Sequence, residues 1–338
     1  MLEIDGSYGE GGGQILRTAV SLSAITKIPI KVTNIRSNRP NPGMQASHLE
    51  AVNSVAQLCR AKTTARLGDT YVTFEPKKIE GGNFFINIGT AGAISLVLQS
   101  LILPSLHAEK PVILRIHGGT HVKWSPSMDY MTNVFSYYME KIGVPMHIAI
   151  ENYGFYPSGG GTVDVAITPS TPKPLDLTQR GKELKTEIIS VASSDLKKAD
   201  VAERQILGAE RFVKFHKKST SYVPASCPGS AVHAQVLFDN CLLGASAIGE
   251  KSLAAQSVGA AAGQSLRKQI DSEACIDEFM ADQLLPFLAI AKGSSTVKVA
   301  DITDHVRTNM WVIEQFLPVD FEINEKERLI RIKQRSNS

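Results

Sequence analysis

Cysteine is scarce in this sequence, and its spacing argues against two kinds of structure. The cysteines are Cys59, Cys227, Cys241 and Cys275, and no two of them form a Cys-x-x-Cys pair. This spacing argues against a zinc ribbon and, inside a cell, against a structural disulfide. We therefore expect buried thiols at all of these positions.

Long apolar runs are absent as well. No segment reaches the roughly 18 uninterrupted apolar residues that a membrane-spanning helix needs. The first residues, MLEIDGSYGEGGG, lack the basic start and the apolar run of a secretion signal. We therefore expect a cytoplasmic protein that does not enter a membrane.

Neither sign of charge is in large excess. Lys plus Arg number 36 and Asp plus Glu number 33, so the net charge is only +3. This balance is far from the basic stripe of a protein that coats nucleic acid. The composition permits RNA binding without indicating it.

The sequence does contain a recurring order of elements. Its 338 residues are too many for one ordinary core, and hydrophobic periodicity predicts helix, strand, helix and returning strands three times over. The predicted units comprise 14–25, 28–35, 44–60, 71–74 and 84–88; 91–106, 111–117, 129–142, 147–150 and 162–167; and 276–291, 296–300, 309–317 and 321–332.

Residues 182–272 break this order and follow a proline-rich loop. Their own pattern predicts strands and helices at 187–192, 201–215, 233–238 and 253–269. We predict an α/β (α+β) fold in which three repeated βαβαββ-like units form a large domain, residues 1–181 and 273–338, and a smaller α/β domain, residues 182–272, is inserted before the third unit. One continuous domain followed by a second is the alternative.

A glycine-rich segment from Gly9 to Gly13 leads into the first predicted helix. Backbone N–H groups at such a helix start can approach a phosphate closely. No Lys-Ser or Lys-Thr follows, so this is not a Walker loop, and the Rossmann spacing is absent. A tight turn is the alternative, but Glu10 and Arg17 on either side suit a hard metal ion and a phosphate.

Two further patterns place polar groups in loops. Arg36 and Arg39 follow a predicted strand, with His48 shortly after them, and two arginines in such a loop can form an anion site. From these residues alone, solvated surface arginines are the favoured interpretation. His305 stands at a strand-to-helix junction, where a neutral imidazole can attack phosphorus, although a capping or packed histidine is the alternative. His117 and His121 have a ligand-like spacing, but the two glycines between them argue against a helical zinc site.

The chain resembles the RNA 3'-terminal phosphate cyclase family over nearly its whole length. The motifs that carry the resemblance are Asp5-Gly-x-x-Gly-Glu10-Gly-Gly-Gly-Gln-Ile-Leu-Arg17, Ile35-Arg36-x-x-Arg39-x-x-Pro42-Gly43, Gly118-Gly119-Thr120, Gly154-Phe-Tyr-Pro-x-Gly-Gly-Gly161 and His305-x-x-Thr-Asn309. The resemblance implies three units similar to the C-terminal domain of a bacterial translation initiation factor, with a small domain inserted before the third.

It also implies an ATP-dependent enzyme that converts the 3'-terminal phosphate of RNA into a 2',3'-cyclic phosphate. In this family a histidine takes AMP from ATP and releases pyrophosphate, AMP passes to the RNA 3'-phosphate, and the neighbouring 2'-hydroxyl closes the ring. ATP is thus a substrate, RNA with a 3'-terminal phosphate is the partner, and a divalent metal, Mg²⁺ or Mn²⁺, is expected. Assembly into homo-oligomers stays open.

The resemblance assigns roles to particular residues. It implies that His305 is the residue that becomes nucleotidylated and that Glu10 lies near the metal. It also implies one set of residues that bind ATP or AMP and another set that bind the RNA 3'-phosphate. The ATP or AMP residues are Gln99, Pro126, Phe279, Asp282 and Gln283, and the RNA 3'-phosphate residues are Arg17, Arg36, Arg39, Ser47 and His48. Ser47 stands where many members have glutamine, and Phe279 stands where some have tyrosine.

Two other classes of protein remain alternatives. A cyclase-like protein of ribosome assembly shares the architecture without the nucleophile, and His305 with Thr308-Asn309 argues against it. Enolpyruvyl transferases have a related repeat architecture, but they need two comparable repeat domains, and the inserted segment is too short to be one.

Overall fold

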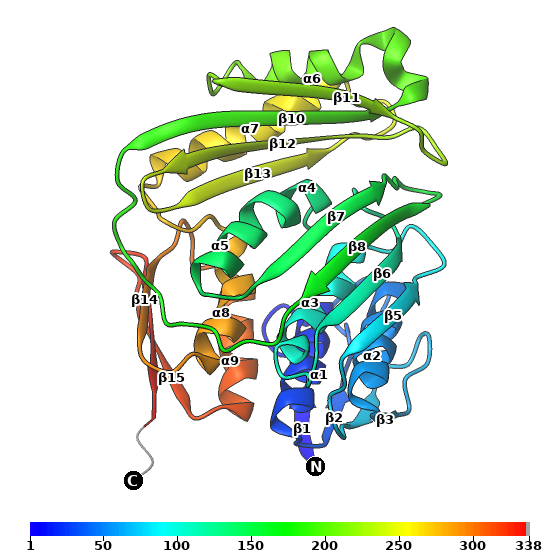
Figure 1. Ribbon diagram of the computed structural model, residues 1–338, viewed down its shortest axis with the longest axis vertical. Coiled ribbons are helices and arrows are strands. Elements are labelled where there is room, and N and C mark those ends of the chain that lie inside the picture. Colours follow the sequence, from blue (N-terminus) through cyan, green and yellow to red (C-terminus); the bar gives the residue numbers. More distant parts are fainter. Residues whose placement is uncertain (336–338) are drawn as a thin grey trace.

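The computed structural model describes residues 1–335, which form four four-stranded β-sheets with helices packed on them (Figure 1). The mixture of parallel and antiparallel strands with helices confirms the predicted α/β class.

Three of the sheets share one strand order and one pairing sense. In each, the first pair of neighbouring strands is parallel and the other two pairs are antiparallel. In spatial order the strands are β1 (Leu2–Asp5), β2 (Ile30–Thr33), β4 (Val72–Glu75) and β3 (Lys62–Thr63); β5 (Gly82–Asn87), β6 (Val112–Gly118), β8 (Gly161–Ile167) and β7 (Met146–Asn152); and β9 (Asp176–Leu177), β14 (Ser295–Lys298), β16 (Leu329–Gln334) and β15 (Val319–Asn324).

Helices link and cover these strands, because parallel neighbours need a crossover connection. They are α1 (Gly13–Thr26), α2 (Ala46–Cys59), α3 (Ile94–Ser105), α4 (Met128–Tyr130), the π-helical η1 (Met131–Phe135), α5 (Ser136–Lys141), α8 (Met280–Ile290) and α9 (Asp304–Phe316). Helix α3 is largely apolar and mostly buried, as expected of a helix packed inside the molecule.

The fourth sheet lies at one end of the molecule, at the top of Figure 1. Its strands are β11 (Lys217–Val223), β10 (Glu183–Ser193), β12 (Ser230–Phe238) and β13 (Leu242–Ile248), and its helices are η2 (Ser194–Ala199), α6 (Val201–Ala209) and α7 (Ala255–Asp271). All of these elements fall within the segment predicted as an insertion. The domain boundaries at 181/182 and 272/273 stay a prediction.

The structure corrects several predicted elements. The strand predicted at 84–88 as the end of the first unit is β5, which opens the second sheet because its backbone groups pair with β6. The helix predicted at 201–215 ends at Ala209, since Val213 and Phe215 leave it to lie in the core. Strands β11 and β13 were not predicted, because β11 is a polar edge strand and β13 is rich in small residues.

Helix α9 begins five residues earlier than predicted, at Asp304 rather than at Asn309. The hydroxyl oxygen of Thr303 accepts a hydrogen bond from the backbone N–H of Val306 at 3.2 Å, which caps the helix start. This earlier start places His305 in the first turn of the helix.

The thiol prediction is right for three cysteines and wrong for one. Cys59, Cys241 and Cys275 are buried, whereas Cys227 is only half-buried, because it lies in a loop and its thiol contacts the carbonyl oxygen of Phe155 at 3.4 Å. Among residues 1–335, no helix is both long enough and apolar enough to cross a bilayer.

Helices α1, α8 and α9 meet in the middle of the molecule, beside α3 (Figure 1). Their apolar faces, with buried residues such as Leu16, Leu284 and Ile313, form part of the core. Burial of these faces brings the polar residues at the start of α1, α8 and α9 to one place, although the residues are almost 300 positions apart in the sequence.

Candidate active site

The turn between β1 and α1 presents a carboxylate at the start of a helix. The backbone N–H of Ser7 donates to Asp5 Oδ1 at 2.9 Å, which holds the beginning of the turn. Helix α1 then starts at Gly13, where a Cβ atom would lie 1.9 Å from Nε2 of His48. Only glycine permits this close packing. Glu10 lies inside the turn, and its carboxylate accepts a hydrogen bond from Arg39 at 2.9 Å.

His305 lies next to this carboxylate. Its Nε2 is 3.2 Å from Oε2 of Glu10, and its Nδ1 is 2.5 Å from Oε1 of Gln14. About half of the side chain, 48%, is exposed to solvent. The ring is therefore held by the glycine-rich turn and the start of α1, while it remains accessible to a ligand.

Gln14 determines which nitrogen of the imidazole carries the proton. Its amide nitrogen donates to Oδ2 of Asp282 at 2.8 Å and to the backbone oxygen of His305 at 3.3 Å. The amide oxygen consequently accepts from Nδ1–H of His305. In the neutral ring, Nε2 then carries the lone pair.

The surroundings of His305 favour the neutral ring. Partial burial lowers its pKa below the ordinary value, and the positive charges of Arg17 and Arg39 lower it further. Glu10 and Asp304 act in the opposite direction, but the net shift is downward. At neutral pH the imidazole is mostly unprotonated, which is the form that can act as a nucleophile.

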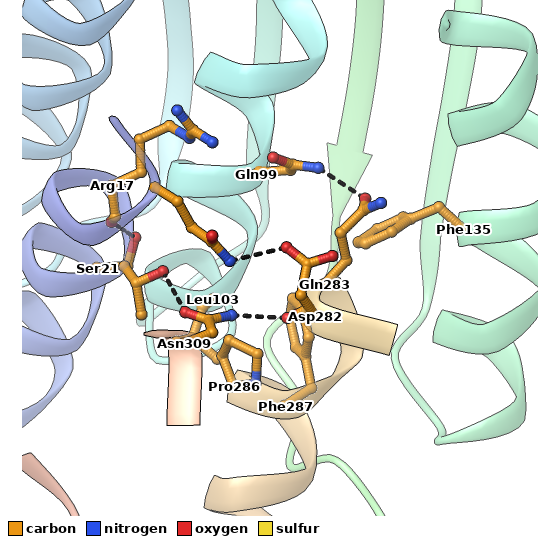
Figure 2. A pocket seen from close by; sticks show the side chains of 12 residues that line it. Arg17, Ser21, Gln99, Leu103, Phe135, Asp282, Gln283, Pro286, Phe287 and Asn309 are labelled. Carbon is orange, nitrogen blue, oxygen red and sulfur yellow. Dashed lines mark hydrogen bonds between the residues drawn. The ribbon is translucent and has the colours of Figure 1, made fainter. Parts of the chain in front are cut away.

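A pocket opens between α1, α3, α8 and α9 (Figure 2). One of its lining residues is Gln14, which contacts His305. Its lining residues are Gln14, Arg17, Thr18, Ser21, Gln99, Leu103, Phe135, Asp282, Gln283, Pro286, Phe287 and Asn309. The wall thus combines amides, one carboxyl group and one guanidinium with an apolar floor, a composition common in small-molecule sites.

Three of the residues assigned to the nucleotide site lie in this wall. The amide nitrogen of Gln99 donates to Oε1 of Gln283 at 2.6 Å, and the amide nitrogen of Gln283 donates to the backbone oxygen of Phe279 at 2.5 Å. Burial raises the pKa of Asp282 to about 7, against the attraction of Arg17. Burial also lowers the pKa of Arg17 to about 10, so its guanidinium stays charged at neutral pH.

Pro126 and Phe279 lie outside the residues that line the pocket. The backbone oxygen of Pro126 accepts from the hydroxyl of Ser95 at 2.7 Å, near the start of α3. Phe279 precedes α8, is 41% exposed and meets the Tyr130 ring edge-on at 6.3 Å. Asp277 orients this corner, because its Oδ1 accepts from the backbone N–H of Phe279 at 3.0 Å.

The residues assigned to an RNA phosphate surround the same turn but differ in the hydrogen bonds and ion pairs that they already make within the protein. Arg36 donates to the backbone oxygens of Asn41 and Gly43, so it holds its own loop. Arg39 is paired with Glu10. Within residues 1–335, the guanidinium of Arg17 has no hydrogen-bond partner of its own.

His48 and Ser47 complete this set on the first turn of α2. Burial, together with the charges of Arg17 and Arg36, lowers the pKa of His48 to about 3, so the ring is neutral. Its Nδ1 accepts from the backbone N–H of Gln45 at 3.3 Å, which leaves Nε2–H as a donor. Ser47 packs against Gly92, which precedes α3.

Sequence reasoning missed the polar pairs that join α1 to α9. The hydroxyl of Thr18 donates to Oδ1 of Asn309 at 2.7 Å, and Nδ2 of Asn309 donates to the backbone oxygen of Asp282 at 2.7 Å. Gln14 with Thr18, and His305 with Asn309, are four residues apart on their helices, which places each pair on one face. That spacing of polar residues on one helix face was the available signal.

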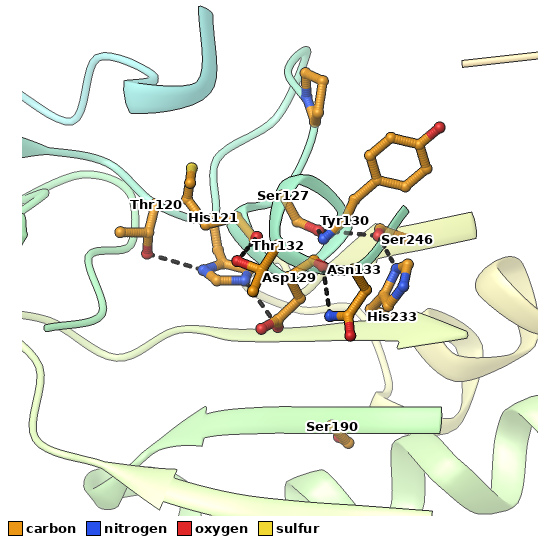
Figure 3. A network of polar contacts seen from close by, with 12 residues as sticks. Thr120, His121, Ser127, Asp129, Tyr130, Thr132, Asn133, Ser190, His233 and Ser246 are labelled. Carbon is orange, nitrogen blue, oxygen red and sulfur yellow. Dashed lines mark hydrogen bonds and ion pairs between the residues drawn. The ribbon is translucent and has the colours of Figure 1, made fainter. Parts of the chain in front are cut away.

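The two histidines considered for zinc lie apart from this site and serve other contacts. His121 is fully buried, with Nε2 3.0 Å from Oδ2 of Asp129 and Nδ1 2.8 Å from the hydroxyl of Thr120 (Figure 3). His117 instead contacts the hydroxyl of Thr162 at 2.8 Å. In the part of the chain that the structure describes, no cluster of three or more His, Cys, Asp or Glu side chains has the arrangement of a metal site.

Asp282 makes the stability of the protein depend on pH. Its carboxyl has a pKa of about 7 when folded, against an ordinary value of 3.8, so between these values the folded chain retains a proton that the unfolded chain has lost. The free energy of unfolding must then fall as the pH rises through this window. We expect Asp282→Asn to be more stable than the unmodified chain near pH 8, with this gain disappearing near pH 4.

Urea unfolding of both proteins at the two pH values measures this difference. Asp176→Asn is a suitable control, because Asp176 is exposed at the start of β9. A gain of the same size at both pH values would contradict the predicted protonation of Asp282.

Comparisons with known proteins agree on one family. Residues 8–323 match the family model described as RNA 3'-terminal phosphate cyclase. Proteins of that name from Methanopyrus kandleri and Pyrococcus furiosus are 41% and 42% identical, over 97% and 96% of this chain and 96% and 95% of theirs. A third, from Methanosarcina barkeri, is 40% identical over 98% of this chain and 99% of its own.

A solved enolpyruvyl transferase, NikO from Streptomyces tendae, aligns with 99% of this chain and 82% of its own. The sequence identity is 9% and the TM-score is 0.30, which is too low to carry an argument.

Proposed function

The chain belongs to the RNA 3'-terminal phosphate cyclase family, and from this premise we propose that it converts the 3'-terminal phosphate of RNA into a 2',3'-cyclic phosphate at the expense of ATP. The observation that carries the proposal is the position of His305. A neutral imidazole, oriented by Gln14 and partly exposed, stands beside a charged pocket.

The first step is nucleophilic attack by Nε2 of His305 on the α-phosphorus of ATP. A nitrogen–phosphorus bond forms, the bond from the α-phosphorus to the bridging oxygen breaks, and pyrophosphate leaves with the electron pair. Hydrogen bonding of Nδ1–H to Gln14 stabilises the positive charge that develops on the ring. We assign Gln99, Asp282 and Gln283, which line the pocket, to the nucleotide site, together with Pro126 and Phe279, which lie outside its lining.

The second and third steps occur on the RNA. An oxygen of the 3'-phosphate attacks the phosphorus of the histidine-bound AMP and breaks the nitrogen–phosphorus bond. The adjacent 2'-hydroxyl then attacks the 3'-phosphorus, loses its proton and displaces AMP. This ring closure is intramolecular and gains from proximity. Arg17, Arg36, Arg39, Ser47 and His48 supply the positive charge and the donors for the RNA phosphate.

Glu10 would hold a divalent metal ion, Mg²⁺ or Mn²⁺. The chain offers one carboxylate at this place rather than a complete set of ligands, which fits an ion that binds chiefly to substrate phosphates and water. When bound, such an ion offsets the negative charge of a triphosphate. The cytoplasmic location and assembly into homo-oligomers stay predictions from the sequence.

Labelling with ATP that carries radioactive α-phosphorus tests the proposal. The protein, incubated with this ATP and Mg²⁺ or Mn²⁺, should take up label in an acid-labile, alkali-stable bond, as expected for a phosphoramidate. Addition of an oligonucleotide with a 3'-phosphate should discharge the label and yield a 2',3'-cyclic end. Uptake of label without a cyclic product would leave an adenylating enzyme of another kind.

Substitution of Arg17 provides a way to distinguish the contribution of this residue to the RNA step from its contribution to the ATP step. Replacement by alanine removes a charged group that has no hydrogen-bond partner among residues 1–335, so it should weaken the RNA step by about 30-fold, the value of a charged contact near 2 kcal/mol. Formation of the histidine–AMP bond should change much less.

The measurement is the RNA concentration that gives half-maximal discharge of the label. Arg115→Ala is the matched control, because Arg115 lies on the exposed face of β6 and pairs with Asp164. An equal loss in both steps would show that Arg17 does not distinguish RNA from ATP.

A further inference from the structure

Two aromatic side chains stack directly beside the candidate active site. The ring of Tyr8, in the turn before α1, lies 4.0 Å from the ring of Trp311 in α9, and the two planes differ by only 11°. Tyr8 is 44% exposed, and its hydroxyl makes no hydrogen bond within the described chain. The stack therefore links the turn before α1 directly to α9.

The next residue, Gly9, touches the same helix. Its φ is +56°, and a Cβ atom there would lie 2.5 Å from the hydroxyl oxygen of Thr308. Thr308 and Trp311 follow His305 by three and six residues, so they lie one and two turns along α9. The turn is thus pressed against the helix that carries the proposed nucleophile, at two consecutive residues.

Glu10 comes immediately after these contacts. Its carboxylate is 3.2 Å from His305 and 2.9 Å from Arg39. On the C-terminal side, Gln14 and Thr18 attach α1 to α9, but Glu10 precedes the helix and is flanked by two glycines with positive φ. A segment of this kind needs an attachment on its N-terminal side to hold one position.

We propose that Tyr8 and Trp311 form an aromatic clamp that positions Glu10 against His305 during transfer of AMP to the enzyme. Neither residue touches the reacting atoms, so both are positioning residues. The inference rests on the proposed function, because AMP transfer is the step that the clamp would serve.

The clamp predicts a difference between two substitutions at Tyr8. Tyr8→Ala removes the stack and should lower the single-turnover rate of histidine–AMP formation about tenfold at saturating ATP, because small displacements of reacting groups are costly. The ATP concentration for half-maximal rate should stay nearly the same. Tyr8→Phe retains the ring and should stay within about twofold of the unmodified rate. Tyr71→Ala, at an exposed tyrosine next to β4, is the control.

A double-substitution cycle tests whether the two rings act as one unit. Trp311→Ala alone should slow the step as much as Tyr8→Ala, and the double variant should be no slower than either. Losses that multiply in the double variant would overturn the clamp, as would a Tyr8→Phe variant as slow as Tyr8→Ala.

Amide hydrogen exchange gives a readout that does not need ATP. Residues 6–13 should exchange faster in Tyr8→Ala than in Tyr8→Phe, while the core strands keep their protection, which also shows that the variant is folded. If the unmodified protein takes up label but both Tyr8 variants match it in rate and exchange, the clamp is refuted and the proposed function stands. If the unmodified protein takes up no label, the proposed function fails. The proposal that the clamp positions Glu10 for AMP transfer then fails with it.

Discussion

Replacement of His305 by alanine is expected to abolish the covalent protein–AMP bond and, with it, RNA cyclisation, a loss of at least about a thousandfold. Nε2 of this residue is the nitrogen left with a lone pair once Gln14 has engaged Nδ1. Glu10, Arg17 and Arg39 all lie close enough to this half-exposed ring to affect its pKa. The measurement is label retained on the protein after incubation with α-labelled ATP.

A matched variant makes this result specific. His147→Ala removes a histidine that is exposed on β7, outside the pocket, and should retain full labelling. The His305→Ala protein should unfold at a temperature close to that of the unmodified chain, because its ring is half exposed. Persistent, acid-labile label in His305→Ala would remove this residue as the nucleophile.

Gln14→Leu is expected to have the second largest effect, a decrease of about 100-fold in the rate of histidine–AMP formation. Leucine is similar in size, so the packing of α1 is largely preserved, but the acceptor for Nδ1–H is lost. The ring can then take the other tautomer, in which the nitrogen that faces the ligand carries the proton. The buried carboxyl of Asp282 also loses the amide that donates to it.

Single-turnover labelling measures the rate, and the ¹⁵N shifts of the imidazole report the tautomer. Gln57→Leu, the same change at an exposed position on α2, is the control and should have no effect. If Gln14→Leu retained the Nδ1–H tautomer and the full rate, the orienting role assigned to Gln14 would be wrong.

The arginines of the site contribute in two ways. Burial is the largest cause of the lowered pKa of His305, and Arg17 and Arg39 lie close enough to the imidazole to lower it further. Arg17 also lines the pocket, where negatively charged phosphates would bind. The same positive charges thus favour the unprotonated imidazole and would attract anionic ligands.

Prediction from sequence was most successful where chemistry is local. The α/β class, most helices of the large units and the polar motifs around Glu10, Arg36 and His305 could be identified from periodicity, residue type and spacing. These features depend on a few neighbouring residues, and burial of an amphipathic face determines the element that forms. Assignment of the catalytic roles required the family resemblance as well.

Other features could not be derived from the sequence. Strand β5 belongs to the second sheet rather than the first because of its backbone pairing with β6, which no side-chain pattern specifies. The polar edge strand β11 is held by its neighbour β10 rather than by its own hydrophobicity. The roles of Gln14 and Tyr8 depend on α9, whose residues are close to them only in the folded chain.

The amino-acid sequence by itself determined most of the helices and several of the strands, and it carried the motifs that indicate the family, since helix and strand periodicity and glycine-rich turns act over short distances. Only the tertiary structure decided that the pKa of His305 is lowered, which of its nitrogens contacts Gln14 and which carboxylate it faces. Those properties arise from burial and from charges within a few ångströms. They exist only when packing of α1, α8 and α9 brings together residues that are distant along the chain.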